Sequence, residues 1–336
     1  MTTDLEELDG VGPNMAEKLI ENGFRTLDAI AAAKPGNLTR IHGISQNVAE
    51  QLIEQASKKA GGAYGLKFIT GDELVKFYES REKLTTGCKS LDKILKGGLV
   101  TGKLYEFWGP EGSGKSNMAL QLVCTAAMPK EKGGLGGKAI YIDAENSLSM
   151  ERVGEIAPRF GLDPLVVFKG ISRNVPQNVD ALLYVCEKLL PKIIQETGAK
   201  IIVLDSIATH FRSEYGAKRQ ELPERQQKAS KVAHALKRCA KIYECVALMT
   251  NQSTADPSGW GSGIKHSMGN IIGHESEVRI RITVKSTKNK ERNFYIEKAV
   301  DLPNETVILK ISKTGFHDKN GSVKVTAEPK IVKKKR

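Results

Sequence analysis

The sequence predicts an α/β protein with a mostly parallel central sheet flanked by helices, antiparallel strands near the C-terminus and a small all-helical domain at the N-terminus. Three observations predict this fold. Apolar strand patterns alternate with helical patterns between residues 100 and 250, strand patterns alone follow residue 275, and residues 1–60 carry only helical patterns. Regular alternation of strands and helices favours a parallel sheet with right-handed crossovers.

The composition is that of an ordinary globular protein, because 40% of the 336 residues are hydrophobic and 27% are charged. This length favours about two domains. Lysine and arginine number 51 against 39 aspartate and glutamate residues, which gives a formal net charge of +12. Such an excess attracts a polyanionic partner, although solubility alone would also account for it.

Several classes of protein are excluded by the sequence. The five cysteines are scattered and never form a CxxC pair, so neither a disulfide framework nor a zinc site is indicated. The acidic N-terminus is not a secretory signal, and no apolar run reaches the roughly 18 residues of a membrane span. We expect no membrane association and a cytoplasmic, nucleoid-associated location.

Residues 1–60 contain an internal repeat. Residues 8–21 match residues 41–54 at Gly, Asn, Ala, Glu, Leu, Ile and Glu, with an offset of about 33 residues. Each copy predicts two helices joined by a tight glycine turn and resembles a helix-hairpin-helix unit, which binds a DNA phosphate through turn N–H groups. We expect Gly10 and Gly12 to form such a turn, and the Gly-Ile-Ser of the second copy to depart from it. A helical domain used only for protein contacts is the alternative.

The segment 61–65, Gly-Gly-Ala-Tyr-Gly, marks the predicted domain boundary. Residues 61–83 then form a linker, in which Phe68-Ile69-Thr70-Gly71 precedes an amphipathic, charged segment at 72–83. A single linker phenylalanine usually packs against its own domain. We predict the core at 84–320 and a basic tail at 321–336.

The phosphate-binding pattern Gly109-Pro110-Glu111-Gly112-Ser113-Gly114-Lys115-Ser116 lies between a predicted strand at 104–108 and helical periodicity at 117–124. In this context the glycines let backbone N–H groups point into one concavity, and the helix N-terminus adds partial positive charge. Lys115 reaches the outer phosphates and Ser116 can hold Mg²⁺. The pattern therefore predicts a nucleoside triphosphate site. A glycine-rich turn that binds nothing would not explain the Lys-Ser pair at the helix start.

Acidic and amide residues follow three later strands. Asp143-Ala144-Glu145 close a strand at 139–142, Asp205 closes the apolar run at 201–204, and Asn251-Gln252 follow a strand at 246–250. The carboxyl ends of parallel strands meet at one edge of a sheet. Asp205 can therefore lie beside the Mg²⁺, and Glu145 can reach a water near the γ-phosphate. Either acid could instead cap a helix.

Two segments are predicted to be loops, and the composition of the second suits contact with nucleic acid. Residues 212–221 mix charge with glycine ahead of a long helical pattern at 220–243, whose basic residues mostly form a solvated face. Residues 253–269 are rich in glycine and serine. The second loop carries Trp260 and Lys265, and basic and aromatic side chains on such a loop suit single-stranded nucleic acid.

Strand patterns at 278–284, 294–296 and 307–311 end the core. The basic turn at 285–292 between the first two is either a phosphate-facing hairpin or a solvated turn.

These elements, in this order, resemble the archaeal RadA recombinases, members of the RecA-like strand-exchange ATPases, over essentially the whole chain before the tail. The resemblance implies a RecA-like P-loop ATPase core with an N-terminal helix-hairpin-helix domain. It also implies a DNA-dependent ATPase that forms a filament on single-stranded DNA and catalyses homologous pairing and strand exchange in recombination and repair. Besides the repeat and the phosphate loop, the matching segments are 68–71, 131–135, 141–145, 151–152, 204–206, 210–215, 224–227, 250–252 and 269–274.

The resemblance also implies how copies of the chain assemble. Phe68 would insert into the core of a neighbouring subunit, with Gly71 as the small residue of the same motif, and a helical filament or ring would form. The segment Asp301-Leu302-Pro303 would cap ATP bound to an adjacent subunit. The resemblance also allows a monovalent cation such as K⁺ to bind near this cap. Single-stranded and double-stranded DNA are the implied partners.

For the chemistry, the resemblance implies that Glu145 orients the attacking water while Lys115 binds phosphate. Arg152 would stack on adenine. Gln252 would sense the γ-phosphate and pass that state to the segment 253–269, which would line the DNA channel together with residues 213–221. The DNA ligands that the resemblance implies in this part of the chain are Arg212, Lys218, Arg219, Arg225, Trp260 and Lys265.

The chain departs from the family's motifs at three places. After Glu145 the family usually continues Gly-Thr-Phe-Arg, whereas residues 146–149 are Asn-Ser-Leu-Ser. In the first DNA loop, residues 218–221 are Lys-Arg-Gln-Glu, one residue longer than the family's Arg-Gly-containing sequence, and the second DNA loop carries Gly-Trp-Gly at 259–261. The first departure motivates an alternative, a recombinase paralogue or mediator that binds ATP and DNA and remodels filaments without strand exchange. A ring-forming helicase or motor is a third interpretation.

Overall fold

The computed structural model describes residues 4–24, 26–31, 33–59, 70–215, 221–255 and 264–319. The chain divides into two compact units, Met1–Ser80 and Arg81–Arg336. Phe68, Lys218, Arg219 and Trp260 lie outside the described residues, and of Lys265 only the backbone is described.

The regular elements described in the N-terminal unit are all helices, because its apolar residues recur at helical spacing. Leu5, Leu19, Ile30 and Leu38 are fully buried members of its core. The elements of this unit are η1 (Asp4–Glu7), α1 (Pro13–Glu21), α2 (Leu27–Ala31), α3 (Pro35–Leu38), α4 (Gln46–Lys59) and α5 (Gly71–Ser80).

The two repeat turns have the same geometry. Gly10 and Gly43 both have positive φ angles, of 84° and 99°. The carbonyls of Gly12 and Ser45 each accept a hydrogen bond, 2.9 Å long in both copies, from the N–H four residues on. The expectation that the second turn departs from the first is wrong. The position that differs between the copies has an ordinary φ of −83° at Gly12, which serine also adopts.

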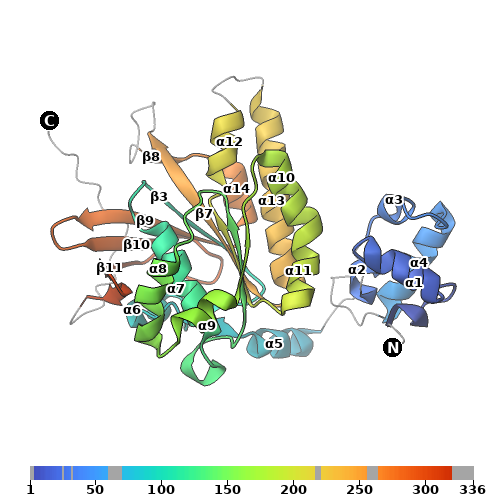
Figure 1. Ribbon diagram of the computed structural model, residues 1–336, viewed down its shortest axis with the longest axis horizontal. Coiled ribbons are helices and arrows are strands. Elements are labelled where there is room, and N and C mark those ends of the chain that lie inside the picture. The colour runs from blue at the N-terminus through green and yellow to red at the C-terminus, as the bar shows by residue number, and fades with distance from the viewer. Residues whose placement is uncertain are drawn as a thin grey trace. The chain divides into compact units, whose positions relative to one another are not determined.

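The second unit is built on one large sheet (Figure 1). Its strands follow the order β12-β11-β10-β9-β3-β7-β6-β4-β5, with β8 paired to β7. In this order, neighbouring strands are antiparallel from β12 to β9 and parallel from β9 to β5. The main-sheet strands are β3 (Leu104–Gly109), β4 (Ala139–Asp143), β5 (Ile171–Asn174), β6 (Ile201–Asp205), β7 (Val246–Ala255), β8 (Ile264–His266), β9 (Val278–Ser286), β10 (Glu291–Lys298), β11 (Thr306–Ser312) and β12 (Gly315–Asp318).

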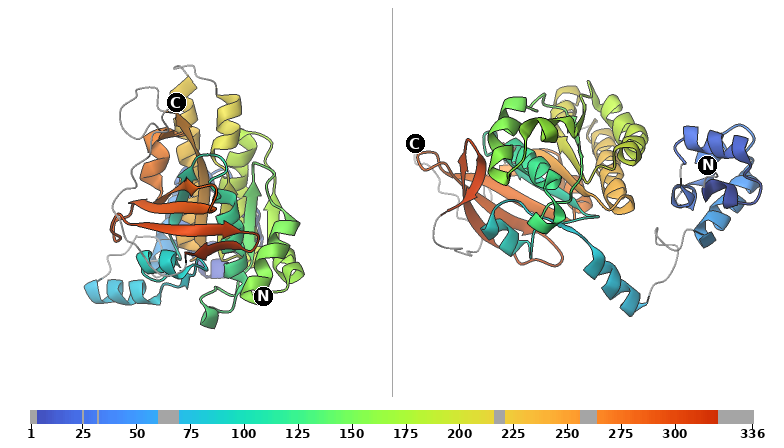
Figure 2. Two further views of the ribbon diagram at one scale, coloured as in Figure 1. Left: turned by 90° about the vertical axis from the view of Figure 1, so that its left-hand side faces the viewer. Right: turned by 60° about the horizontal axis from the view of Figure 1, so that its bottom comes forward.

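Helices cover both faces of this sheet, as two further views also show (Figure 2). One face carries α6 (Lys89–Ile94), α7 (Lys115–Ala127), α8 (Met150–Ile156), η3 (Ala157–Phe160) and α9 (Pro164–Lys169). The other carries α10 (Val179–Tyr184), η4 (Val185–Leu189), α11 (Leu190–Thr197), α12 (Ala208–Glu214), α13 (Leu222–Ile242) and α14 (Gly269–Glu275). The remaining elements are a small sheet of β1 (Lys83–Leu84) and β2 (Leu99–Val100), and the short turn η2 (Lys130–Lys132).

The core strands are buried on both sides, so alternate residues enter different cores. Val203 and Leu248 face α7, whereas Leu204 and Met249 face α13. This burial explains why the parallel strands appear in the sequence as continuous apolar runs. None of the helices that the structure describes has the length and apolar composition of a bilayer-crossing segment.

The structure corrects the ends of both predicted loops, whose middle parts, 216–220 and 256–263, lie outside the described residues. Arg212 is helical, because α12 continues to Glu214. The segment 253–269 is not structureless, since β7 extends to Ala255 and β8 pairs back on it antiparallel, with Ser253 opposite His266. We call β7 from Ser253 together with β8 the ribbon. Its backbone hydrogen bonds did not show in the sequence because its residues do not alternate between apolar and polar.

Candidate nucleotide site

The phosphate loop follows β3 directly and ends at α7, the context that the motif requires. Gly109, Gly112 and Gly114 have positive φ angles of 153°, 70° and 100°. A Cβ on Gly109 would lie 2.0 Å from the Ile282 carbonyl oxygen, and one on Gly114 would lie 2.6 Å from the Phe316 ring. Both the backbone conformation and the packing therefore require glycine at these two positions.

Lys115 and Ser113 provide the loop with hydrogen-bond donors that could bind an anion. The Lys115 ammonium donates to the carbonyls of Gly109 at 3.1 Å and Pro110 at 3.0 Å. Burial lowers the pKa of Lys115, and the carboxylates of Glu145 and Asp205 partly oppose this shift. The Ser113 hydroxyl is buried without a hydrogen-bond partner among the described residues. A bound anion at the N-terminus of α7 would satisfy such donors.

Asp205 lies at the end of β6 and is 1% exposed. Its Oδ2 accepts hydrogen bonds from Tyr141 and Ser147, each 2.8 Å long, and its Oδ1 accepts one from Thr250. Within the described part of the chain, no lysine or arginine forms an ion pair with this carboxylate. A buried carboxylate of this kind is an oxygen ligand that suits a hard divalent cation, and the Ser116 hydroxyl in the first turn of α7 is a second ligand of that type.

Glu145 and Gln252 meet at the carboxyl edge of the sheet, as predicted. The Glu145 carboxylate accepts hydrogen bonds from Ser206 at 2.6 Å, Gln252 at 2.8 Å and Thr209 at 3.2 Å. Arg212 donates to the side-chain oxygen of Gln252. An open cleft of about 540 Å³ lies at this edge, and it is lined by Ala144, Glu145, Thr209, Arg212, Ser213 and Gln252.

Arg152 lies beside the first turn of α7. Its Nε donates to Asn117 at 2.6 Å, and its Nη2 donates to the Ser312 carbonyl at 2.8 Å. It also forms an ion pair with Glu155. The guanidinium is therefore fixed between α7 and the β11–β12 turn, and its stacking on adenine stays a prediction.

Asp301 lies near the N-terminal end of strand β3, whereas the phosphate loop follows the C-terminal end of that strand. Its side chain accepts a hydrogen bond from Lys103 at 3.0 Å, and its carbonyl accepts one from Lys96 at 2.6 Å. Lys103 precedes β3, whereas the phosphate loop follows it, and the six residues of β3 span about 20 Å. Asp301 and Pro303 are thus far from the phosphate loop of their own chain.

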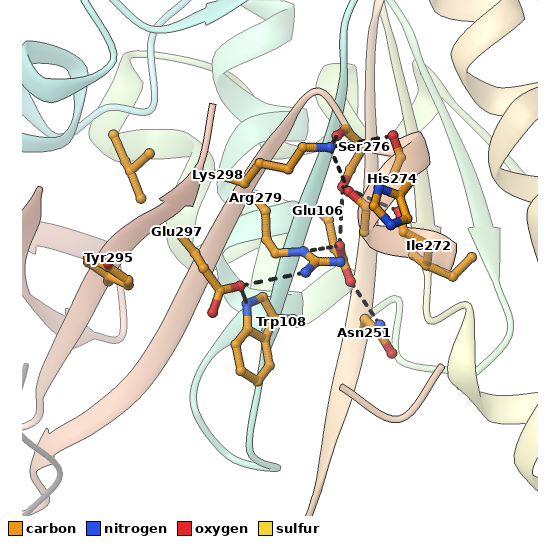
Figure 3. A network of polar contacts seen from close by, with 12 residues as sticks. Glu106, Trp108, Asn251, Ile272, His274, Ser276, Arg279, Tyr295, Glu297 and Lys298 are labelled. Atoms are coloured by element: carbon orange, nitrogen blue, oxygen red, sulfur yellow. Dashed lines mark hydrogen bonds and ion pairs between the residues drawn. The ribbon is translucent and has the colours of Figure 1, made fainter. Parts of the chain in front are cut away.

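The sequence reasoning missed a buried polar network around Glu106 (Figure 3). Glu106, in the middle of β3, is fully buried and accepts hydrogen bonds from Arg279 at 2.8 Å, Asn251 at 2.8 Å and Ser276 at 3.3 Å. The available signal was a charged residue inside the apolar run at 104–108. Its partners could not be identified, because Arg279 is 173 residues away.

The network extends to β10 and α14. Lys298 donates to the carbonyls of Gly273 at 2.6 Å and Ser276 at 2.8 Å, which close the C-terminal end of α14. Trp108 donates to Glu297 at 2.8 Å, and burial raises the pKa of that carboxyl. The phosphate-loop strand is thereby fixed to the antiparallel strands on one side.

On its other side the network reaches the ribbon. Asn251 accepts a hydrogen bond from the Ser267 hydroxyl at 2.8 Å, and the Ser267 carbonyl accepts one from Arg225 at 2.6 Å. Burial lowers the pKa of Arg225, and the nearby charge of Arg212 adds to this effect. Arg225 therefore supports the base of the ribbon, whatever further contact it makes.

A strand, glycine loop and helix, with a buried acid and a second carboxylate on neighbouring strand ends, define a P-loop nucleotide-binding protein. The chain belongs to the Rad51 family, whose model matches residues 80–319. A model described as a SAM-like helix-hairpin-helix tandem matches residues 2–58. Both the recognised resemblance and the predicted fold class are confirmed.

Two curated relatives are each called "DNA repair and recombination protein RadA". The protein of Metallosphaera sedula is 35% identical over 315 residues, which cover 94% of this chain and 95% of that protein. The protein of Aeropyrum pernix is 34% identical over 316 residues, covering 94% of this chain and 97% of that protein. The similarity thus includes both the helical N-terminal unit and the core.

Proposed function

We propose that this protein is an ATP-dependent DNA recombinase, which forms a filament on single-stranded DNA and catalyses homologous pairing and strand exchange in recombination and repair. It hydrolyses ATP in a DNA-dependent manner and works in the cytoplasm, on the nucleoid. Residues 1–60 serve as a DNA-binding domain, residues 61–83 as a linker, 84–320 as the ATPase core and 321–336 as a basic tail.

One observation carries this proposal: the nucleotide site and the ribbon share strand β7. Gln252 pairs in register with Gly109 of the phosphate loop, and its side chain contacts Glu145. The next residue, Ser253, already belongs to the ribbon. A change at the γ-phosphate position can therefore act on the ribbon within one residue, which is the linkage that a nucleotide-controlled DNA-binding protein needs.

The residues of the site fit ATP and Mg²⁺. Lys115, Ser113 and the backbone of residues 109–116 would hold the phosphates, while Ser116 and Asp205 would hold the metal. Bound Mg²⁺ would neutralise phosphate charge. Glu145 would orient the attacking water, and the hydrogen bonds that fix its carboxylate at the edge of the cleft support this role.

We assign the nucleotide to the interface between subunits. Arg152 would contact the base from its own chain, while Asp301 and Pro303 would cap ATP on a neighbour. The position of Asp301 supports this role, since it is too far from its own phosphate loop to act there. Phe68 and Gly71 would join consecutive subunits.

The proposed DNA ligands belong to two regions. Gly10 and Gly12 would present turn N–H groups to a phosphate, and the left-handed backbone at Gly10 supports this role. In the core, Arg212 and Arg225 lie beside the ribbon, and we expect Lys218, Arg219, Trp260 and Lys265 to contact single-stranded DNA.

Hydrolysis and assembly together test this function. With ATP, Mg²⁺ and single-stranded DNA, the protein is expected to form helical filaments visible by electron microscopy, and DNA should stimulate phosphate release. Rings in place of filaments would favour the ring-forming motor. Filaments that hydrolyse ATP without ever pairing homologous strands would favour the mediator.

A further inference from the structure

The turn that carries Glu145 folds around the carboxylate of Asp143. Asp143 ends β4 and is fully buried. Its Oδ1 accepts a hydrogen bond from the Ser147 N–H at 2.7 Å, and its Oδ2 accepts one from the Leu148 N–H at 3.2 Å. The Asp143 side chain therefore closes the turn 144–148, and any displacement of that carboxylate would move Glu145 as well.

Arg173 holds this carboxylate from the neighbouring strand. β5 lies parallel to β4, with Arg173 in register with Tyr141. Its Nε and Nη2 both donate to Asp143 Oδ2, at 2.8 Å and 2.6 Å, and Nη2 also donates to the side-chain oxygen of Asn146. We call these three residues, Arg173, Asp143 and Asn146, the clasp. Its hydrogen bonds are of the strong, charge-assisted kind.

The clasp also separates the roles of two neighbouring acids. Asp143 and Asp205 are paired in register on β4 and β6, and the Ser147 hydroxyl bridges them, at 3.4 Å and 2.8 Å. Arg173 balances the charge of Asp143. The side chain of Asp205, by contrast, is bonded by hydroxyl groups within the described residues. The arginine thus leaves Asp205 as the acid whose charge a bound cation would balance.

Asn146 connects the clasp to the departure from the family's motif. Its φ angle is 54°, a left-handed conformation that asparagine tolerates better than most residues. Its side-chain oxygen supplies the contact with Arg173 that a glycine at this position would lack. The altered segment is therefore an ordered turn held by an arginine from β5.

We propose that Arg173 is a positioning residue for ATP hydrolysis: through the clasp it holds the turn 144–148 so that the Glu145 carboxylate faces the phosphate loop. This inference rests on the proposed function, because it takes the role of Glu145 from it. Arg173 itself touches neither the phosphate loop nor Glu145, so it acts through the turn.

The first test is a pair of substitutions. Arg173→Met, which removes the charge, is expected to lower kcat for ATP hydrolysis by about tenfold to a hundredfold, because a small displacement of a catalytic group has effects of this size. KM should change less than about threefold, since the phosphate-binding groups are untouched. Arg173→Lys keeps the positive charge but loses the paired contacts of Nε and Nη2, so its kcat should lie between those of Arg173→Met and the wild type. Lys169→Met, at an exposed position of α9, serves as the control and should match the wild type.

The second test is chemical rescue of Arg173→Ala. The Arg173 side chain is 38% exposed, so a small cation can enter the space that the substitution leaves. Millimolar guanidinium is expected to restore hydrolysis several-fold in this variant and to leave the wild type unchanged. A purely structural role would not give this response.

Either of two results would overturn the positioning role: a wild-type kcat in Arg173→Met, or a loss in Arg173→Ala that guanidinium does not reverse. If a thermal melt shows that Arg173→Met is unfolded, the kcat of Arg173→Lys and the guanidinium rescue of Arg173→Ala test the positioning role instead. An inactive wild-type protein would instead count against the proposed function itself.

Discussion

The Glu145→Gln variant is expected to hydrolyse ATP at least about 100-fold more slowly than the wild type while still binding ATP and DNA. Glutamine keeps the size of the side chain and can still accept hydrogen bonds from Ser206 and Gln252, so the cleft should stay folded. It lacks the negative charge that orients and activates a water molecule. The substitution therefore separates hydrolysis from binding.

Two quantities are measured for each protein: the steady-state rate of phosphate release in the presence of single-stranded DNA, and the affinity for DNA in the presence of ATP. Glu187→Gln, on η4 outside the cleft, is the control and should behave as the wild type. We expect DNA to stay bound longer on the variant, because the nucleotide is not turned over. Unchanged turnover in Glu145→Gln would mean that another group positions the water.

Replacing Phe68 with alanine is expected to give a folded, ATP-binding protein that does not polymerise. An aromatic side chain buried in a neighbour's core supplies a large part of the binding energy of such an interface, so its loss should weaken each subunit contact by a factor on the order of 100 or more. Because a filament needs every contact in series, the effect on its length should be larger still.

Electron microscopy and light scattering with ATP and single-stranded DNA measure this effect. Tyr64→Ala, another linker aromatic outside the motif, is the matched control. Long filaments from Phe68→Ala would refute the assigned role, whereas filaments lost in both variants would point to the linker as a whole. ATP binding by the isolated subunits confirms that the variants are folded.

The sequence predicted the elements whose physical cause is local. The strand, glycine loop and helix around Lys115 follow from short-range chemistry, as does the repeat at Gly10 and Gly43. The meeting of Glu145 with Gln252 was also predictable, because parallel strands end at one edge of the sheet. The first two inferences rest on short sequence segments, whereas the third also needs the general geometry of parallel sheets.

The features that the sequence did not reveal depend on distant partners. The bond between Glu106 and Arg279, and the pairing of β8 with β7, join residues with no local pattern between them. The limits of α12 were missed because its last residues, 212–214, are polar or charged and are followed closely by a glycine, a pattern that also suits a loop. The clasp was missed for a similar reason, since its members Asp143 and Arg173 come from separate strands.

The central claim is that ATP binding at this site drives exchange of homologous DNA strands. A strand-exchange assay with a labelled duplex oligonucleotide and a homologous single strand measures it most directly. We predict that the wild-type protein with ATP and Mg²⁺ displaces the labelled strand, and that omitting ATP or using a non-homologous strand abolishes the displacement. Equal displacement with and without ATP, or none with a homologous strand, would contradict the claim.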